Sequence, residues 1–260
     1  MDKSMLGQIF WRSLLIQCVL NFEKMQNSGF TTAMMPVIKK LFPQKEEQKK
    51  ALLRHFENFN TQPYVANIIV GMIAAKEKEY ASSGDNKILD DIHRLKEQTA
   101  RSFASLGDTF FWGTWRPFMS LVGIVIVASG IILERQALIG IGIAVFLIVY
   151  NLLPLMVRWY GLRLGYEKQE KAIEVILKAK SVIQKITWWI QGIGLTMLAC
   201  FGVFLSSKMI ATIGGQSSLI SNLLSGAIVL WVAVTLRRIS TSKIMILAII
   251  ISVIQAYVFG

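Results

Sequence analysis

The feature that most constrains this chain is a set of long apolar runs in its second half. The run ALIGIGIAVFLIVYNLLPLMV, at 137–157, contains 21 residues and no charge. A helix needs roughly 20 apolar residues to cross a bilayer. The whole chain is 53% hydrophobic with a positive mean hydropathy, which soluble domains of this length do not usually reach. We therefore predict an all-α, polytopic integral membrane protein.

Hydropathy predicts five membrane spans in this half of the chain. They are 118–133, 137–157, 188–205, 219–236 and 244–259. The first and fifth contain only 16 residues each, so hairpin arms or tilted helices remain alternatives for them. Residues 158–185 carry seven Lys or Arg against three Glu, whereas 206–218 holds only Lys208. Because basic loops stay inside, this alternation predicts a cytoplasmic N-terminus and a C-terminus outside.

Charge and cysteine content narrow the function classes. The net charge is +12, but the basic residues lie between apolar runs rather than in one stripe. This pattern favours an anionic bilayer surface as the partner over nucleic acid. The two cysteines, Cys18 and Cys200, suggest no disulfide framework and no metal site. The N-terminus does not resemble a signal peptide, because Arg12 and Gln17 interrupt its apolar stretch.

The first half of the chain is more polar. Residues 1–116 hold 16 of the 28 Lys and Arg and 12 of the 16 Asp and Glu, which predicts a cytoplasm-facing and re-entrant helical region before a transmembrane region at 117–260. Within it we predict an amphipathic helix at 6–26, an apolar piece at 30–42 kinked near Pro36, a soluble-type helix at 44–59, and a short apolar segment at 64–75. The last segment is too short to cross alone, so it is a re-entrant arm or a buried helix.

A polar interruption, Asn60-Thr61-Gln62-Pro63, separates the 44–59 helix from the apolar segment that follows. That helix is predicted to place Leu52, Leu53, Phe56 and Phe59 on one face and to end near Asn60, because a residue before proline avoids the α region. Non-helical backbone at membrane depth is tolerated only where protein buries it or where it lines a wet cavity. Transporters use such broken helices to bind substrate.

The side chains near this interruption suit a sugar. Asn and Gln amides both donate and accept hydrogen bonds, and carboxylates such as Glu23 or Asp108 accept strong ones from hydroxyls. Trp112 and Trp115 offer flat apolar faces for a sugar ring. Simpler roles remain open: Asn60 as a helix C-cap, Asp108 as the N-cap of the helix leading into the first span, Arg116 as its cytoplasmic flank, and Asn21, Glu23 and Gln26 as solvated groups of an amphipathic helix.

No catalytic or metal-binding motif accompanies these residues. His55 and His93 lie in charged stretches and are both predicted to be solvated, with no nucleophile or acid at a suggestive spacing. The pattern GLRLG at 161–165 fits the GxxxG helix-contact motif, but it is weak evidence among charged residues. We therefore expect no catalytic residue, no metal and no cofactor.

Three blocks resemble one known family. They are RSLLIQCVLNFEKMQNSGF (12–30) leading into PVIKKLFP (36–43), RHFENFNTQPY (54–64), and GDTFFWGTWRP (107–117). In their letters, order and spacing they are similar to the IID membrane subunit of the mannose/fructose/sorbose-type sugar phosphotransferase system. RWYGLRLGY, at 158–166, also resembles the basic turn that follows a span in this family.

The resemblance implies a role, a location and partners. IID pairs with a polytopic IIC subunit in the bacterial cytoplasmic membrane, and oligomers of such pairs translocate a hexose or related sugar. Separate IIA and IIB subunits carry the phosphoryl group, so IID itself is expected to be no enzyme. Transferred through the three motifs, the sugar-binding residues would be Asn21, Glu23, Gln26, Asn60, Thr61, Gln62, Asp108, Trp112 and Arg116.

The chain departs from the family before the third block. Where relatives usually carry a Gly- and Pro-rich run of the type GPLAGVGD, this chain reads ARSFASLGD at 100–108. Two rival functions follow. One is a degenerate IID-like scaffold or regulatory protein without transport. The other is a membrane enzyme or ion carrier that uses Glu23 and Asp108, against which the missing acid–base partner argues.

Overall fold

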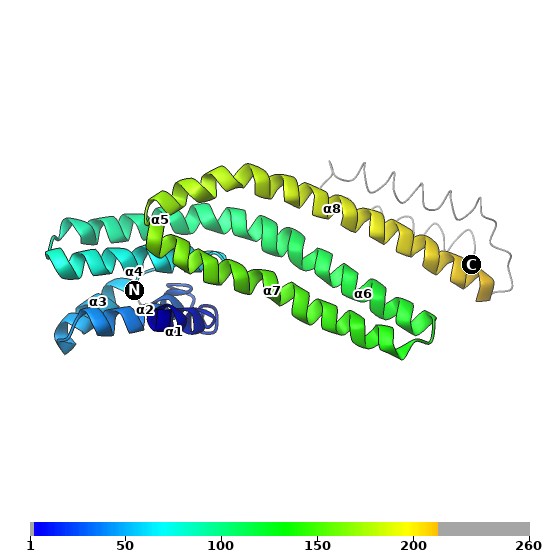
Figure 1. Ribbon diagram of the computed structural model, residues 1–260, viewed down its shortest axis with the longest axis horizontal. Helices are drawn as coiled ribbons and strands as arrows, with labels where there is room; N and C mark the ends of the chain where they lie inside the picture. Colours follow the sequence, from blue (N-terminus) through cyan, green and yellow to red (C-terminus); the bar gives the residue numbers. More distant parts are fainter. Residues whose placement is uncertain (1–2, 213–260) are drawn as a thin grey trace. The chain divides into compact units, whose positions relative to one another are not determined.

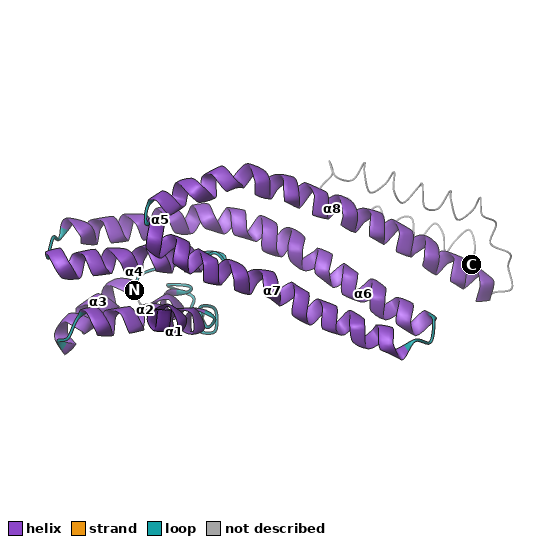
Figure 2. Cartoon of the chain, in the orientation of Figure 1, coloured by secondary structure: helices purple, strands orange, loops and turns teal. Residues whose placement is uncertain are grey.

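The computed structural model describes residues 3–212, which form helices joined by short turns (Figure 1, Figure 2). In chain order the helices are α1 (Lys3–Ser13), α2 (Asn27–Leu41), α3 (Lys45–His55), α4 (Ala66–Ser83), α5 (Lys87–Gly107), η1 (Asp108–Trp115), α6 (Arg116–Ile132), α7 (Gln136–Lys168) and α8 (Lys171–Thr212). The chain divides into two compact units, Met1–Trp188 and Trp189–Gly260. Of the second unit only residues 189–212, the end of α8, are described. The all-α prediction is confirmed for the described residues.

The first unit is built around α4. All residues from 66 to 77 are buried, and α4 contacts α2, α5 and α7, while α1 and α3 pack against α2. The predicted apolar segment at 64–75 is therefore a helix that protein buries. It continues beyond that segment to Ser83, where Gly84 at φ +69° closes the helix by donating to the Tyr80 carbonyl.

Glycines set the contact between α4 and α7. A Cβ on Gly71 would overlap the Leu162 carbonyl oxygen, and a Cβ on Gly165 would overlap the Ile68 carbonyl oxygen. At Gly161 it would lie 2.8 Å from a side-chain carbon of Ile68. The two backbones can approach this closely only because no side chain stands between them. The GLRLG pattern is thus a real helix contact, made inside one chain.

The helices α5, η1 and α6 form one uninterrupted run, Lys87–Ile132. The alternative that Asp108 is the N-cap of a new helix is wrong, because its backbone is helical (φ −63°, ψ −45°) and its N–H donates to the Ala104 and Ser105 carbonyls. From Asp108 to Trp115 the helix is π-helical, and the Thr114 hydroxyl donates to the Thr109 carbonyl five residues earlier, at 3.0 Å. Such π-helical turns are rare and frequently occur at functional sites.

The helices α6 and α7 form an antiparallel hairpin that contains the two clearest spans (Figure 1). Small residues, Gly123 and Gly142, lie in its contact, whereas Ile124, Ile131 and Ile148 are each at least 60% exposed. The most apolar windows of these spans are only 17% and 11% buried, which is typical of lipid-facing helices and not of core helices. The predicted spans 118–133 and 137–157 are therefore helices able to cross a membrane.

The other three predicted spans are less defined. Segment 188–205 lies within α8, and segments 219–236 and 244–259 lie outside the described residues. The count of five spans stays a prediction.

Three predicted segments of the first half have different ends. The helix predicted at 6–26 stops at Ser13, whose hydroxyl donates to the Phe10 carbonyl, and turns follow up to Gln26. The helix predicted at 44–59 ends at His55. Its expected apolar face is wrong: Leu53 is 61% and Phe56 43% exposed, while Phe59 is buried in the loop beyond. The next helix, α2, begins at Asn27 rather than at residue 30, with Pro36 inside it.

Candidate functional site

A two-way amide contact joins the first motif to the second. Gln26 is 2% exposed, its Nε2 donates to the Thr61 carbonyl at 2.8 Å, and its Oε1 accepts from the Thr61 N–H at 3.2 Å. The Gln26 N–H donates to the Phe59 carbonyl at 2.8 Å. The Thr61 hydroxyl continues the chain of bonds to the Ala100 carbonyl of α5 at 3.0 Å. Gln26 and Thr61 therefore hold the polar interruption, Asn60-Thr61-Gln62-Pro63, in place.

Asn21 organises the turn before α2. Its Nδ2 donates to Asn27 Oδ1 at 2.6 Å, and its Oδ1 accepts from the Lys24 N–H at 2.7 Å. Asn27 is fully buried and donates to the Phe56 carbonyl at 3.1 Å. Glu23 is exposed on this turn. The prediction that these residues share an amphipathic helix is wrong, because the backbone reverses here, with Met25 at φ +54°.

Gln62 lies against the start of the third motif. It is 1% exposed, and its Oε1 accepts from the N–H groups of Tyr64 and Val65 at 2.7 and 3.3 Å, just before α4 begins. A Cβ added at Gly107 would lie 2.7 Å from the Gln62 Cβ, so glycine there lets the two segments touch. Within the described residues, Gln62 Nε2 and Asp108 Oδ1 are both buried without a hydrogen-bond partner. Partial burial raises the pKa of Asp108.

Aromatic side chains surround the base of the α6–α7 hairpin. The Tyr64 and Tyr150 hydroxyls lie 3.0 Å apart, and the Trp115 indole donates to the Tyr150 carbonyl at 3.2 Å. The Arg158 guanidinium lies 5.3 Å from the Tyr64 ring centroid and donates to the Ser13 carbonyl at 2.6 Å. Trp112 is 42% exposed on the π-helical turn, and Arg116 is exposed at its end.

The structure thus brings together only part of the predicted set. Gln26, Thr61 and Gln62 meet in one buried loop, and Gln62 contacts Gly107, next to Asp108. Asn21 lies in the turn before α2 and bonds to Asn27 instead of to this loop. Glu23, Asn60, Trp112 and Arg116 are exposed. Sequence reasoning missed Asn27, Tyr64, Tyr150 and Arg158. Tyr64 is the last residue of the motif RHFENFNTQPY, and its place in that motif was the available sequence signal.

A buried ionic cluster connects α3 to α4, which sequence analysis also missed. Arg54 donates to both Glu77 carboxylate oxygens, at 2.7 and 3.0 Å, and Glu77 is fully buried. The prediction that His55 is solvated is wrong: it is 0% exposed, and its Nε2 lies 2.9 Å from Glu77 Oε1. His93, as predicted, is exposed, and it lies 2.9 Å from Glu57. A carboxylate 22 positions away in sequence gave no local signal for His55.

Burial sets the ionisation of this cluster. Burial lowers the pKa of His55, and the nearby Glu77 carboxylate offsets this only in part. For Glu77 burial alone would raise the pKa, but the contacts with His55 and Arg54 outweigh it and hold the pKa below its usual value. We therefore assign a neutral His55 and an ionised Glu77 held by Arg54.

A second buried cation, Lys96, lies on α5. Its residue is 3% exposed, its amine donates to the His55 carbonyl at 3.1 Å, and burial lowers its pKa to about 8. Lys96 occupies the apolar face that Ile92, Leu95 and Phe103 define on α5, and this position was the sequence signal. Among residues 3–212 no group of three or more metal-ligating side chains gathers.

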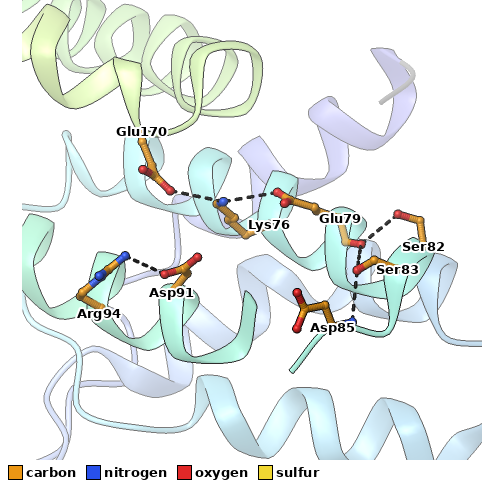
Figure 3. Close-up of polar contacts among 8 residues, drawn as sticks. All are labelled: Lys76, Glu79, Ser82, Ser83, Asp85, Asp91, Arg94 and Glu170. Carbon is orange, nitrogen blue, oxygen red and sulfur yellow. Dashed lines mark hydrogen bonds and ion pairs between the residues drawn. The ribbon is translucent and has the colours of Figure 1, made fainter. Parts of the chain in front are cut away.

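Surface ion pairs fix the end of α4 (Figure 3). The Lys76 amine lies 3.3 Å from both Glu79 and Glu170, so it joins α4 to the turn between α7 and α8. Burial alone would lower the pKa of Lys76, but the two carboxylates outweigh it and raise the pKa. Around the following turn the Ser83 hydroxyl donates to the Glu79 carbonyl and accepts from the Asp85 N–H. These contacts stabilise the end of α4, and we assign them no role in binding or transport.

The sequence is similar to those of two EIID components. The mannose-specific EIID component of Escherichia coli K12 is 40% identical over 163 residues, which cover 62% of this chain and 54% of that protein. The match thus spans about half the length of that relative. The sorbose-specific EIID component of Klebsiella pneumoniae is 33% identical over 203 residues, covering 77% of this chain and 68% of that protein.

Solved structures share the fold. A cryo-EM structure of the mannose transporter ManYZ in complex with microcin E492 contains a chain that is 28% identical, with a TM-score of 0.57 and coverage of 100% of this chain and 97% of that one. A second structure, described as a membrane protein, gives a TM-score of 0.64 at 27% identity. The model of the "PTS system mannose/fructose/sorbose family IID component" matches residues 1–259. The chain therefore belongs to the IID component family of the mannose/fructose/sorbose-type phosphotransferase systems.

Proposed function

We propose that this chain is a IID-type subunit that pairs with a polytopic IIC partner in the bacterial cytoplasmic membrane. The pair, as oligomers, would carry a hexose or related sugar across the membrane. A IIB subunit, charged by IIA, would then phosphorylate the sugar. Family membership over residues 1–259 and the long, apolar and little-buried helices of the α6–α7 hairpin support this proposal.

The observation that carries the sugar site is the pair of unpartnered buried atoms beside Gly107. Gln62 Nε2 has donors to offer, and Asp108 Oδ1 accepts. Leaving such groups unpaired costs roughly 1–3 kcal/mol each, a cost that a bound hydroxyl would remove. A sugar hydroxyl both donates and accepts, so it matches this combination. Asp108 begins the π-helical turn that leads into the first span, and Gln62 lies against Gly107, the residue before it.

The other motif residues take different parts in the proposal. Gln62, Asp108 and the exposed Trp112 would contact the sugar, with Trp112 stacking on the ring. Gln26, Thr61 and Asn21 would hold the loop and would not touch the sugar. Glu23, Asn60 and Arg116 are exposed and would face the partner subunit or the entering sugar. The phosphoryl group would never reside on this chain.

The proposed topology follows the loop charges. The N-terminus and residues 158–185 would face the cytoplasm, and the C-terminus would lie outside after five crossings. In this arrangement the unit around α4 lies on the side where IIB would phosphorylate the sugar.

The test is the Asp108→Asn variant. Cells that express the chain with its cognate IIA, IIB and IIC subunits would be assayed for uptake and phosphorylation of labelled mannose, fructose and sorbose. Because a charge-assisted hydrogen bond is worth roughly 1.5–3 kcal/mol, we expect a roughly 10- to 100-fold loss of uptake at unchanged membrane abundance. The matched control is Asp90→Asn, an exposed carboxylate of α5, which should transport as the wild type does.

A scaffold without transport is the second candidate, and one observation favours it. Where relatives carry a Gly- and Pro-rich run, residues 100–107 form regular α-helix. A scaffold would assemble with its partners and yet give no uptake of any of the three sugars, before and after Asp108→Asn. Uptake that depends on Asp108 would reject it.

A further inference from the structure

A cleft of about 600 Å³ with charged and amide side chains in its lining lies between the loop after α3 and one face of α5. Glu57, Asn58 and Asn60 line it from the loop, and His93, Lys96 and Arg101 line it from α5. It is large enough for a small metabolite of several hydroxyl groups. The amides of Asn58 and Asn60 offer both donors and acceptors toward such a ligand.

Lys96 places a buried ammonium in the cleft, and the Glu57 carboxylate of the same lining acts on it without contacting it. Its amine contacts the His55 carbonyl and lies 4.7 and 5.8 Å from the ring centroids of Phe30 and Phe59. In the part of the chain that the structure describes, no carboxylate lies within 4.0 Å of this amine. A buried ammonium without an anionic partner is costly, and a bound anion would offset that cost.

The other titratable side chains of the cleft contact one another at its rim. Glu57 lies 2.9 Å from His93, and Arg101 donates to Glu97 at 2.6 Å. Both pairs are well exposed, with the Arg101 side chain 80% exposed, so they contribute little and exchange partners at low cost. Arg101 is therefore able to turn from Glu97 to a ligand anion, for which its guanidinium offers two parallel donors.

We propose that this cleft binds a hydroxylated organic phosphate of the size of a hexose phosphate. The phosphoryl group would take the Lys96 ammonium and the Arg101 guanidinium, and the hydroxyl groups would take the amides of Asn58 and Asn60. An ammonium in a desolvated site is a point charge suited to phosphate, and a carbonyl and two aromatic faces fix its position.

This site is separate from the Gln62–Asp108 pair and stands without the transport proposal. One consequence rests on the proposed function. If the chain transports sugar, the ligand has the chemistry of the phosphorylated product. Binding it would then report product accumulation to the loop that Gln26 and Thr61 hold.

Isothermal titration calorimetry on the purified full chain in mild detergent tests the proposal. The probes are fructose 6-phosphate, free fructose, inorganic phosphate and sulfate. We expect fructose 6-phosphate to bind, free fructose to bind at least about tenfold more weakly, and Lys96→Met to lose the difference. The control is Lys87→Met, an exposed lysine of the same helix.

A pH series on the wild type keeps the test independent of any folding defect in the variant. Glu57, His93, Glu97 and Arg101 face the amine from the loop and α5, with His55, Arg54 and Glu77 behind it from α3 and α4. The pH series runs from about 7.5 to 9.5, across the lowered pKa of Lys96 and above the range in which the phosphate dianion takes up a proton. Affinity should therefore fall by up to about tenfold per unit above pH 8, where Lys96 loses its proton.

The outcomes separate the possibilities. Sulfate or inorganic phosphate binding to the wild type as tightly as fructose 6-phosphate would reduce the cleft to a general anion site and overturn the proposal. Free fructose binding to the wild type as tightly as fructose 6-phosphate would make it a neutral sugar site and also overturn it. Loss of binding in Lys96→Met with uptake intact in cells would support the phosphate site and leave the transport proposal standing on its own test.

Discussion

Two apolar parts of this molecule meet very different surroundings. Helix α4 is buried by protein along twelve consecutive residues, 66–77, whereas most apolar side chains of the α6–α7 hairpin are exposed or half-buried. The buried stretch of α4 ends in Lys76 and Glu77, and glycines of α7 line its contact with that helix; the hairpin presents Ile and Leu to its surroundings. Hydropathy alone therefore does not say what covers an apolar helix. Paired buried charges distinguish α4, because glycine contacts also occur inside the hairpin, at Gly123 and Gly142.

The largest effect should come from filling a glycine in the protein-covered part. In Gly165→Val the new side chain would overlap the Ile68 carbonyl and approach the Met72 nitrogen, so α4 and α7 could not keep their contact. Because backbone cannot yield as a side chain does, we expect loss of the folded state, at a cost above about 3 kcal/mol. Size-exclusion chromatography in detergent would show aggregated protein.

The matched control is Gly140→Val in the hairpin, where a Cβ meets nothing within 4 Å. It should elute as the wild type does. Equal damage in both variants would mean that the hairpin is packed as tightly as α4, and the comparison would fail.

The next effect concerns the ions inside the protein-covered part. Glu77→Gln leaves Arg54 with no carboxylate at its guanidinium and removes the partner of His55. Breaking a buried pair in this way costs about 3–5 kcal/mol, and we expect a corresponding fall in melting temperature. Glu79→Gln, which weakens only a surface pair with Lys76, is the control and should melt within about 1 kcal/mol of the wild type.

The same cluster predicts a direction with pH. The pKa values of His55 and Glu77 are both held below their ordinary 6.5 and 4.5. In each case the unfolded chain takes up the proton first, so stability falls as pH drops below 6.5 and again below 4.5. A melting temperature that rises on acidification would contradict this assignment.

Lys96 should show a smaller effect of opposite sign. Its pKa falls from 10.5 to about 8, and at roughly 1.4 kcal/mol per pKa unit its burial costs about 3 kcal/mol at neutral pH. Lys96→Met keeps the volume and removes the charge, so we expect a gain of about 1–3 kcal/mol after the lost bond to His55 is counted.

Chemical or thermal melting over a pH series checks this gain. Because the unfolded lysine keeps its proton up to its ordinary pKa, wild-type stability should rise between pH 8 and 10.5, while Lys96→Met stays flat. Lys87→Met should follow the wild type. A flat wild-type profile would mean that Lys96 is well solvated.

The two parts also differ in how far sequence predicts them. The α6 and α7 spans follow from hydropathy, because lipid imposes the same requirement along their whole length. In the protein-covered part the decisive contacts are remote in sequence: Gln26 binds Thr61 35 positions away, and this contact fixes where the turn after Ser13 leads. No local pattern encodes such a contact, so the sequence predicts a helix at 6–26, whereas the helix ends at Ser13.

The candidate site divides in the same way. Its letters were recognisable, since Gln62 and Asp108 stand in two of the motifs that carry the family resemblance. Their geometry could not be predicted, because Asp108–Trp115 is a π-helical turn inside a continuous helix. In the same way, no local pattern showed that His55 is buried beside a carboxylate of another helix. Motifs thus name residues for a site, and tertiary packing decides which of them meet.

The smallest expected effect tests the comparison most directly. Ile69 and Ile148 are chemically identical, yet Ile69 is 0% exposed in α4 and Ile148 is 66% exposed in α7. Truncating a buried isoleucine to alanine leaves a cavity and costs about 2–5 kcal/mol, whereas lipid or detergent simply fills the space left at an exposed position. Ile148→Ala should therefore change melting by no more than about 0.5 kcal/mol, and Ile69→Ala by several times more. If Ile148→Ala were as costly in the complex with a second polytopic subunit, and harmless in the isolated chain, the face it occupies would be covered by that subunit and not by lipid.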